Sequence, residues 1–140
     1  MNKNDLLNLA IVVATNAHRG QKDKQGQPYI LHPLRVMTNP RLVTDDERII
    51  AVLHDVLEDT ETSEQDLIDI FGTDIVSKVK ILSRADDEDY KSYINRICID
   101  DTIMKVKLSD IEDNLRDGCP ESSRKRYFDA MITIKNKMNS

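Results

Sequence analysis

The chain has 140 residues, 39% of them hydrophobic and 32% charged, and a formal net charge of −5 at pH 7. This length suits one domain, residues 1–140, with its own core but without room for a second catalytic domain. The acidic balance argues against general binding to nucleic acids or anionic membranes. The absence of tryptophan and the low aromatic content also disfavour a base-stacking nucleic-acid surface.

Two cysteines and the apolar segments indicate the cellular setting. Cys98 and Cys119 have no metal-binding spacing and form no disulfide framework, so we expect reduced thiols in a cytoplasmic protein. No apolar stretch has the length needed to span a membrane. The pattern gives no indication of the oligomeric state.

The first predicted helix covers residues 5–18, where apolar side chains recur at helical spacing, and Gly20 is expected to end it. The polar segment 21–27 then predicts a loop over one edge of a pocket. His32 directly precedes Pro33, a residue that suits the first turn of a helix, here one running to about Met37. This histidine is either a metal ligand held at a helix start or a capping or core residue.

The central stretch is AVLHDVLEDT at residues 51–60. Thr44 and Glu47 have the spacing of a capping box, which predicts the start of a helix that carries this stretch and ends near residue 60. On one continuous helix His54 would lie one turn before Glu58, and Asp55 one turn before Asp59. Buried acids need a partner, and imidazole with carboxylate can bind a divalent cation. The alternative is a solvated polar stripe with one structural histidine.

Further helices are predicted over residues 63–72, 73–82, 90–97, 103–115 and 122–138, with a solvated acidic loop at 86–89. The expected buried side of the last helix consists of Tyr127, Phe128, Met131, Ile132 and Ile134. No strand alternation, repeat or linker is present. The pattern therefore predicts one all-α domain of about eight helices.

The segment KLSDIEDNLR at residues 107–116 carries another polar group. Lys107, Asp110 and Asn114 are three and four residues apart, so they share one face of the predicted helix. Glu112 and Asp113 would point elsewhere. Any of the three acids could be a ligand or a solvated side chain.

Four blocks of the chain resemble the HD-domain metal-dependent phosphohydrolases, in the branch of the small alarmone hydrolases and the hydrolase half of RelA/SpoT enzymes. The blocks are AHRGQ at 17–21, GQPYILHPL at 26–34, LHDVLEDT at 53–60 and KLSDIEDNLR at 107–116. The resemblance implies an HD-domain helical bundle in which His32, His54, Asp55 and Asp110 bind one metal ion, and in which the amide of Asn114 orients a ligand. Two nitrogens and two carboxylates suit Mn²⁺, with iron, cobalt or zinc as other candidates.

The same resemblance assigns catalysis to Glu58 and Asp59, which would accept the proton of the attacking water or orient its attack. It implies an anionic nucleotide substrate and removal of the 3′-pyrophosphate from guanosine tetra- or pentaphosphate. Asp23 departs from the family, which usually has a base-binding cation near this position. The candidate substrate-binding residues are Arg19, Lys22, Lys24, Lys107, Asn114 and Arg116, and the cations among them could also be surface charges.

Two other functions fit these residues. One is phosphohydrolysis of another nucleotide, such as an adenine alarmone, a nucleoside monophosphate or NADPH. The other is a nucleotide-binding regulatory module without turnover. The reaction product separates the enzymes, because release of pyrophosphate supports an alarmone substrate and release of orthophosphate supports a phosphate monoester.

Overall fold

The computed structural model describes residues 1–116 and 118–140, and within these residues all regular structure is helical, which confirms the predicted all-α class. An isolated bridge between Lys22 and Pro28 closes the loop before the second helix. The helices of the described residues are α1 (Lys3–Ala17), α2 (Leu31–Met37), α3 (Asp45–Leu53), α4 (Val56–Asp59), α5 (Glu64–Phe71), α6 (Thr73–Leu82), α7 (Tyr90–Ile97), α8 (Asp101–Asn114) and α9 (Glu121–Met138).

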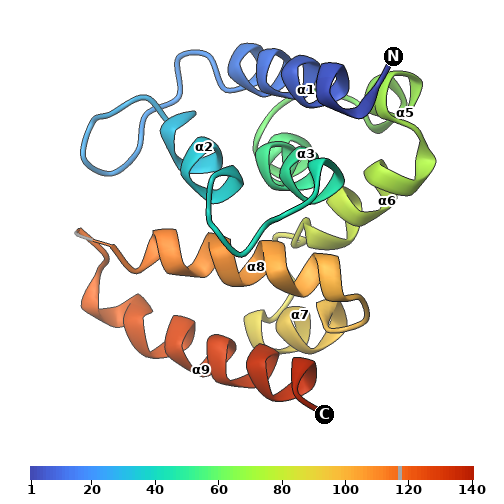
Figure 1. The fold of residues 1–140 in the computed structure, drawn as a ribbon. Helices are drawn as coiled ribbons and strands as arrows, with labels where there is room; N and C mark the ends of the chain where they lie inside the picture. The colour runs from blue at the N-terminus through green and yellow to red at the C-terminus, as the bar shows by residue number, and fades with distance from the viewer. Residues whose placement is uncertain (117) are drawn as a thin grey trace.

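Helix α8 runs through the middle of the molecule (Figure 1). Helices α2 and α3 pack against one side of it and α9 against the other, while α1 covers α3 and α7 packs on α9. Apolar side chains from both sides are fully buried, among them Val36, Ile49, Ile111 and Ile134. The polar residues of α8 are therefore held between two packed layers, which fixes the position of Asp110.

The capping box at the start of α3 is present as predicted. The Thr44 hydroxyl accepts a hydrogen bond from the Glu47 amide at 3.1 Å, and the Glu47 carboxylate accepts from the amides of Val43 and Thr44 at 2.9 Å each. The same carboxylate forms an ion pair with Lys105 of α8 at 2.5 Å. Burial would raise the pKa of Glu47, but these partners outweigh burial and hold the pKa at about 2.

Glu47→Gln is expected to lower the free energy of unfolding by about 1–3 kcal/mol at pH 7, because the amide can still accept from the backbone but leaves Lys105 without its counter-charge. The folded pKa of Glu47 lies below its usual value, so the contribution is present above pH 4.5 and disappears as the pH falls towards 2. Denaturant unfolding of both proteins between pH 7 and pH 3 measures this. A difference that stays constant over that range would contradict the charge argument.

The prediction of one continuous helix through residues 51–60 was wrong, because the helix breaks between Leu53 and Val56. The Ala51 carbonyl accepts from the His54 amide at 3.3 Å and from the His54 ring Nδ1 at 2.6 Å, so the side chain competes for a carbonyl that a continuous helix would use. Asp55 still lies one turn before Asp59, whose amide donates to the Asp55 carbonyl at 2.9 Å.

The buried side predicted for α9 was partly wrong. Phe128 is 50% exposed and Ile132 is 59% exposed, whereas Ala130 and Ile134 face the core. Helix α9 is the outer element of its layer and packs on α7 and α8 along one face only, so its broad apolar stripe is not covered completely. Among the described residues, no helix has both the length and the apolar character that crossing a membrane requires.

Candidate functional site

Three separate segments bring His32, His54, Asp55 and Asp110 together. His32 lies in the first turn of α2, as Pro33 predicted, His54 and Asp55 form the turn between α3 and α4, and Asp110 lies on α8. The His32 Nε2 atom lies 2.9 Å from Asp110 Oδ1 and 3.7 Å from Asp55 Oδ2. The His54 Nε2 atom lies 3.0 Å from Asp55 Oδ2 and 3.3 Å from Asp110 Oδ1. We refer to these four residues as the His-Asp cluster.

The hydrogen bonds of the two histidines leave one ring nitrogen of each facing the cluster. His54 donates from Nδ1 to the Ala51 carbonyl, and His32 donates from Nδ1 to Asp113 at 2.7 Å. With the proton on Nδ1 in each ring, Nε2 carries a lone pair and points at the cluster. This arrangement, in which a second partner fixes the tautomer, is the usual one for histidines that bind metals.

The His-Asp cluster has the donors, spacing and charge for one divalent metal ion. His54 Nε2 is buried and forms no hydrogen bond with a described residue, although two carboxylate oxygens lie close to it. Two ligand atoms at about 2.1 Å from one ion and at a right angle lie about 3 Å apart, which is the spacing seen here. When a cation takes the place of the ring protons, two neutral imidazoles and two carboxylates carry a charge of −2, which a divalent cation balances.

The pKa shifts also indicate a site that attracts positive charge. Burial would raise the pKa of the Asp55 carboxyl, but the neighbouring His54 lowers it to about 2. Burial likewise opposes ionisation of Asp110, but Lys107 and His54 hold its pKa well below the usual range. Burial lowers the pKa of His32, yet its hydrogen bonds to Asp110 and Asp113 raise it to about 9. Both acids are therefore ionised at neutral pH and available to a cation.

Asp113 supports the cluster from behind and was missed by the sequence argument, which expected it to point elsewhere. Its Oδ2 atom accepts from His32, and both of its oxygens accept from the Arg35 guanidinium, at 2.7 and 3.1 Å. The sequence signal was present: the three-residue spacing from Asp110 to Asp113 allows both side chains of α8 to reach α2. Asp113 thus fixes the His32 ring and its tautomer.

Asp113→Asn is expected to weaken metal affinity by about 10–100-fold, because the amide is a weaker acceptor for the His32 Nδ1 proton. Titration of metal-stripped protein with Mn²⁺ measures this. Glu112→Gln, one residue away on the exposed side of α8, is the matched control and should leave the affinity unchanged, since Glu112 pairs with Arg41 instead. Equal Mn²⁺ affinities of the wild type and both variants would contradict a role of Asp113 in metal binding.

Tyr29 is a second residue that the sequence argument did not assign, although it lies in the block GQPYILHPL. Its hydroxyl donates to Asp55 Oδ2 at 2.5 Å. Burial, and then the charge of Asp55, raises the Tyr29 pKa far above its usual value, so the hydroxyl stays protonated and remains a donor. Tyr29 therefore orients Asp55 as Asp113 orients His32.

Glu58 and Asp59 lie in the last turn of α4, beside the cluster. The ligand atoms of Asp55, Glu58 and Asp59 all lie within 4.8 Å of one another. Glu58 accepts from the Arg84 amide at 2.6 Å, whereas the Asp59 carboxylate forms no hydrogen bond with any residue in 1–116 or 118–140. Burial raises the pKa of both acids, and the charge of Asp55 adds to this in each case, together with Asp59 for Glu58 and Asp110 for Asp59. Raised pKa values favour a role in proton transfer.

On α8, the shared face predicted for Lys107, Asp110 and Asn114 is present. The Lys107 ammonium donates to Asp110 Oδ2 at 2.8 Å, and the Asn114 amide donates to Asp110 Oδ1 at 3.2 Å. Asp110 is held from two sides, and Asn114 has the position of a group that orients a ligand. Lys107 is deeply buried, and Asp110 raises its pKa against the effect of burial, so it remains charged.

Two cavities meet at the cluster. A cavity of about 180 Å³, here called the phosphate cavity, is lined by the His-Asp cluster, by Glu58 and Asp59 and by several cations and tyrosines. A second cavity of about 260 Å³, here called the loop cavity, lies under residues 22–25 and reaches the start of α9. Both are lined by Tyr29, His32, Asn114 and Tyr127.

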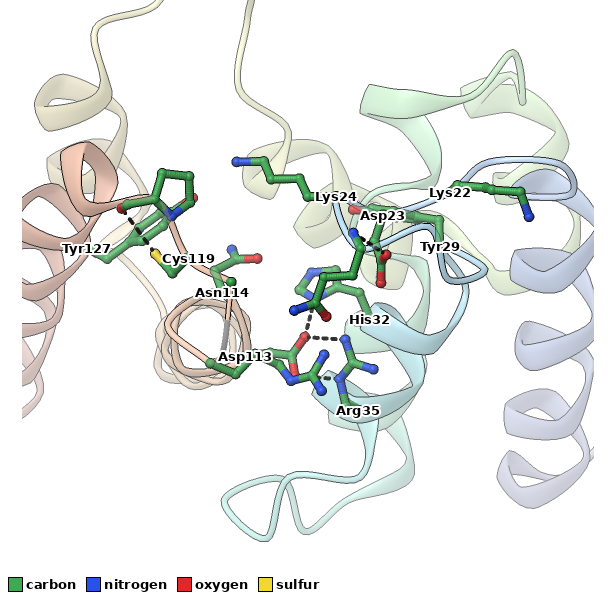
Figure 2. Close-up of a pocket in the computed structure, with 14 residues that line it drawn as sticks. Lys22, Asp23, Lys24, Tyr29, His32, Arg35, Asp113, Asn114, Cys119 and Tyr127 are labelled. Carbon is green, nitrogen blue, oxygen red and sulfur yellow. Dashed lines mark hydrogen bonds and ion pairs between the residues drawn. The ribbon is translucent and has the colours of Figure 1, made fainter.

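The predicted substrate cations are divided between these cavities. Lys107 lines the phosphate cavity, and Lys22, Lys24 and Arg116 line the loop cavity. Figure 2 shows Lys24 extending over the loop cavity, whereas the Lys22 side chain points away from it. Arg19 lines neither cavity, because its guanidinium donates to Asn16 at the exposed end of α1. Lys24, Lys107, Asn114 and Arg116 are therefore better placed than Lys22 and Arg19.

The fold and the cluster together define a known class. The family model of the HD domain matches residues 10–97, and the chain belongs to this family. It is 32% identical over 123 residues to the bifunctional (p)ppGpp synthase/hydrolase SpoT of Escherichia coli strain K12. It is 37% identical over 114 residues to a guanosine-3′,5′-bis(diphosphate) 3′-pyrophosphohydrolase of Aquifex aeolicus strain VF5.

These alignments cover 79% and 74% of the chain but only 18% and 16% of the two relatives. A solved structure agrees over a larger share: it is 27% identical, with a TM-score of 0.78, and the match covers 94% of this chain and 84% of that one. That structure is described as a metazoan ortholog of SpoT that hydrolyses ppGpp and has a role in starvation responses.

Proposed function

We propose that residues 1–140 act as one Mn²⁺-dependent hydrolase domain that removes the 3′-pyrophosphate of (p)ppGpp-type alarmones and yields GDP or GTP and pyrophosphate. The observation that carries this proposal is the convergence of four metal-type donors on one wall of the phosphate cavity, with an acidic pair beside them. The named activities of the relatives support the same reaction. A cytoplasmic location belongs to this proposal, because it is where such a nucleotide would be met.

His32, His54, Asp55 and Asp110 would hold the ion, and Tyr29 and Asp113 would keep two of them oriented. When bound, a divalent ion supplies hydroxide from water near neutral pH and polarises a phosphoryl oxygen. Asp59 and Glu58, next to the ligands, would accept the proton from the attacking water. The buried Lys107 ammonium, which contacts Asp110, adds positive charge where phosphoryl oxygens gather.

The arrangement of the cavities suggests how a nucleotide lies. Its phosphates would occupy the phosphate cavity, and its nucleoside would extend past Tyr29 and Asn114 into the loop cavity. Asp23, the acid that departs from the family, lines the loop cavity, and its Oδ1 atom accepts hydrogen bonds from the backbone amides of Gln25 and Gln27 at 2.9 Å each. This residue therefore shapes the loop that covers the cavity.

The test is a panel of nucleotides given to the Mn²⁺-loaded protein, with each product identified. The panel contains guanosine and adenosine 3′,5′-bis(diphosphates), nucleoside monophosphates and NADPH. Pyrophosphate with GDP as the main products supports the proposal. Release of orthophosphate from a monophosphate or from NADPH would contradict the proposal and indicate a phosphomonoester hydrolase. Binding without turnover would also contradict it and indicate a regulatory module.

A further inference from the structure

Three cationic side chains surround the ring of Tyr90 at the wall of the phosphate cavity. Lys107 Nζ lies 5.9 Å from the ring centroid, and the guanidinium carbons of Arg84 and Arg126 lie 5.4 and 4.5 Å from it. They come from three elements, the segment after α6, helix α8 and helix α9, and all line this cavity. We call these four residues the Tyr90 cluster.

Two of these three cations are not part of an ion pair within the described residues. Lys107 pairs with Asp110, but the guanidinium groups of Arg84 and Arg126 form no ion pair with any carboxylate in residues 1–116 or 118–140. Two acids on the same elements are already paired, Glu88 with Arg96 and Asp129 with Lys125, at 2.8 and 2.9 Å. The Glu58 carboxylate, which lines the same cavity, accepts the backbone amide of Arg84 and not its side chain.

The arginines are held in place by the tyrosines. Arg126 lies over two rings, those of Tyr90 and Tyr127, and Arg84 over one. Such contacts orient a guanidinium and leave its N–H donors free for another partner. In a chain of net charge −5, two oriented arginines that line one cavity and form no ion pair with a described residue indicate an anionic ligand.

The hydroxyl of Tyr90 gives an independent indication. Its oxygen is buried and forms no hydrogen bond with a described residue. Leaving a buried hydroxyl unpaired costs about 1–3 kcal/mol, so buried hydroxyls normally have a partner. A phosphate oxygen in the cavity would accept this hydrogen bond together with those of the two guanidinium groups.

We infer that the Tyr90 cluster binds the terminal phosphate of the 3′-pyrophosphoryl group, an assignment that rests on the proposed function. In that reaction the water oxygen forms a bond to the phosphorus atom that is attached to the 3′-oxygen. The bond between this phosphorus and the 3′-oxygen breaks. The 3′-oxygen leaves with the electron pair, takes a proton and becomes a hydroxyl, and pyrophosphate is released. Lys107 contacts both Asp110 and the Tyr90 ring, so the first phosphate would lie at the metal and the second at the arginines.

The consequence is selection for a pyrophosphate over a single phosphate. Calorimetric titration of the Mn²⁺-loaded full chain with inorganic pyrophosphate and with orthophosphate tests this, with metal content measured after each titration. Arg126→Gln and Arg84→Gln are each expected to weaken pyrophosphate binding by about tenfold. Orthophosphate binding should change by less than about twofold, because one phosphate at the metal does not reach the arginines.

Lys125→Gln is the matched control, since it removes the same charge one residue before Arg126 from an exposed side chain paired with Asp129. It should leave both affinities unchanged. The inference is overturned if the arginine variants bind pyrophosphate as the wild type does, or if both anions weaken equally. Tyr90→Phe removes one oxygen only, and it replaces the arginine variants as the test if one of them fails to fold. A reduction of its pyrophosphate affinity by about threefold or more supports the subsite, and an unchanged affinity refutes it.

These titrations require no turnover, so the two proposals fail separately. If the wild type does not hydrolyse alarmones but the arginine variants selectively lose pyrophosphate binding, the proposed function is refuted and the subsite remains. Alarmone hydrolysis with unchanged pyrophosphate affinity in the arginine variants would refute the subsite alone.

Discussion

Asp55→Ala is expected to remove bound metal and to lower turnover at least about a thousandfold, which corresponds to about 4 kcal/mol of transition-state stabilisation. Asp55 has three contacts within the site: its Oδ2 atom lies 3.0 Å from His54 Nε2 and 3.7 Å from His32 Nε2 and accepts a hydrogen bond from the Tyr29 hydroxyl. Without it the donor set loses one of its two negative charges. Metal analysis of purified protein and turnover with an alarmone measure the effect.

The fold should survive this substitution. Asp55 lies in a turn, and the main structural loss is the acceptor of the Tyr29 hydroxyl, worth about 1–3 kcal/mol. Helical circular dichroism should therefore stay close to that of the wild type. Asp55→Asn keeps an acceptor for Tyr29 but removes the charge, so it separates the metal effect from the structural one. Asp86→Ala, on an exposed loop, is the control that should keep metal and activity. An Asp55→Ala protein with normal metal content and turnover would refute the assignment.

The sequence predicted the helical fold and the convergence of the cluster for different reasons. Helix starts were readable because they depend on local chemistry, as at Thr44 and Ser63, whose side chains accept the expected capping hydrogen bonds. The cluster depends on contacts between residues far apart in the sequence, such as the 2.9 Å approach of His32 to Asp110 over a separation of 78 residues. Spacing alone does not give such contacts, and the resemblance to a family supplied them.

The parts that sequence reasoning missed share a physical cause. The helix break at His54 arises because an imidazole competes for a backbone carbonyl, and helical periodicity does not report this competition. Asp113 and Arg126 were missed because their roles depend on what faces them across α8 and α9, His32 in one case and two tyrosine rings in the other. Charged residues of this kind cannot be told from surface charges until the helices are packed.

Asp59→Asn and Glu58→Gln are expected to lower kcat by about 10²–10⁴-fold and to leave metal content unchanged. We expect the larger loss for Asp59. The Glu58 carboxylate already accepts the Arg84 amide at 2.6 Å, which stabilises its charge, whereas the Asp59 carboxylate accepts no hydrogen bond from a described residue and is more available for a proton.

Both variants conserve size, and the side-chain amide introduced by Glu58→Gln keeps an acceptor for the Arg84 amide, so neither should disturb α4. Glu61→Gln, just beyond α4 and exposed, is the matched control and should keep full activity. The informative readout is metal content beside kcat. Proton transfer from water does not require Glu58 or Asp59 to bind the metal. If either variant loses metal, the result therefore shows that the three acids Asp55, Glu58 and Asp59 hold a cation together. If both variants keep their metal and the wild-type kcat, neither acid is the base.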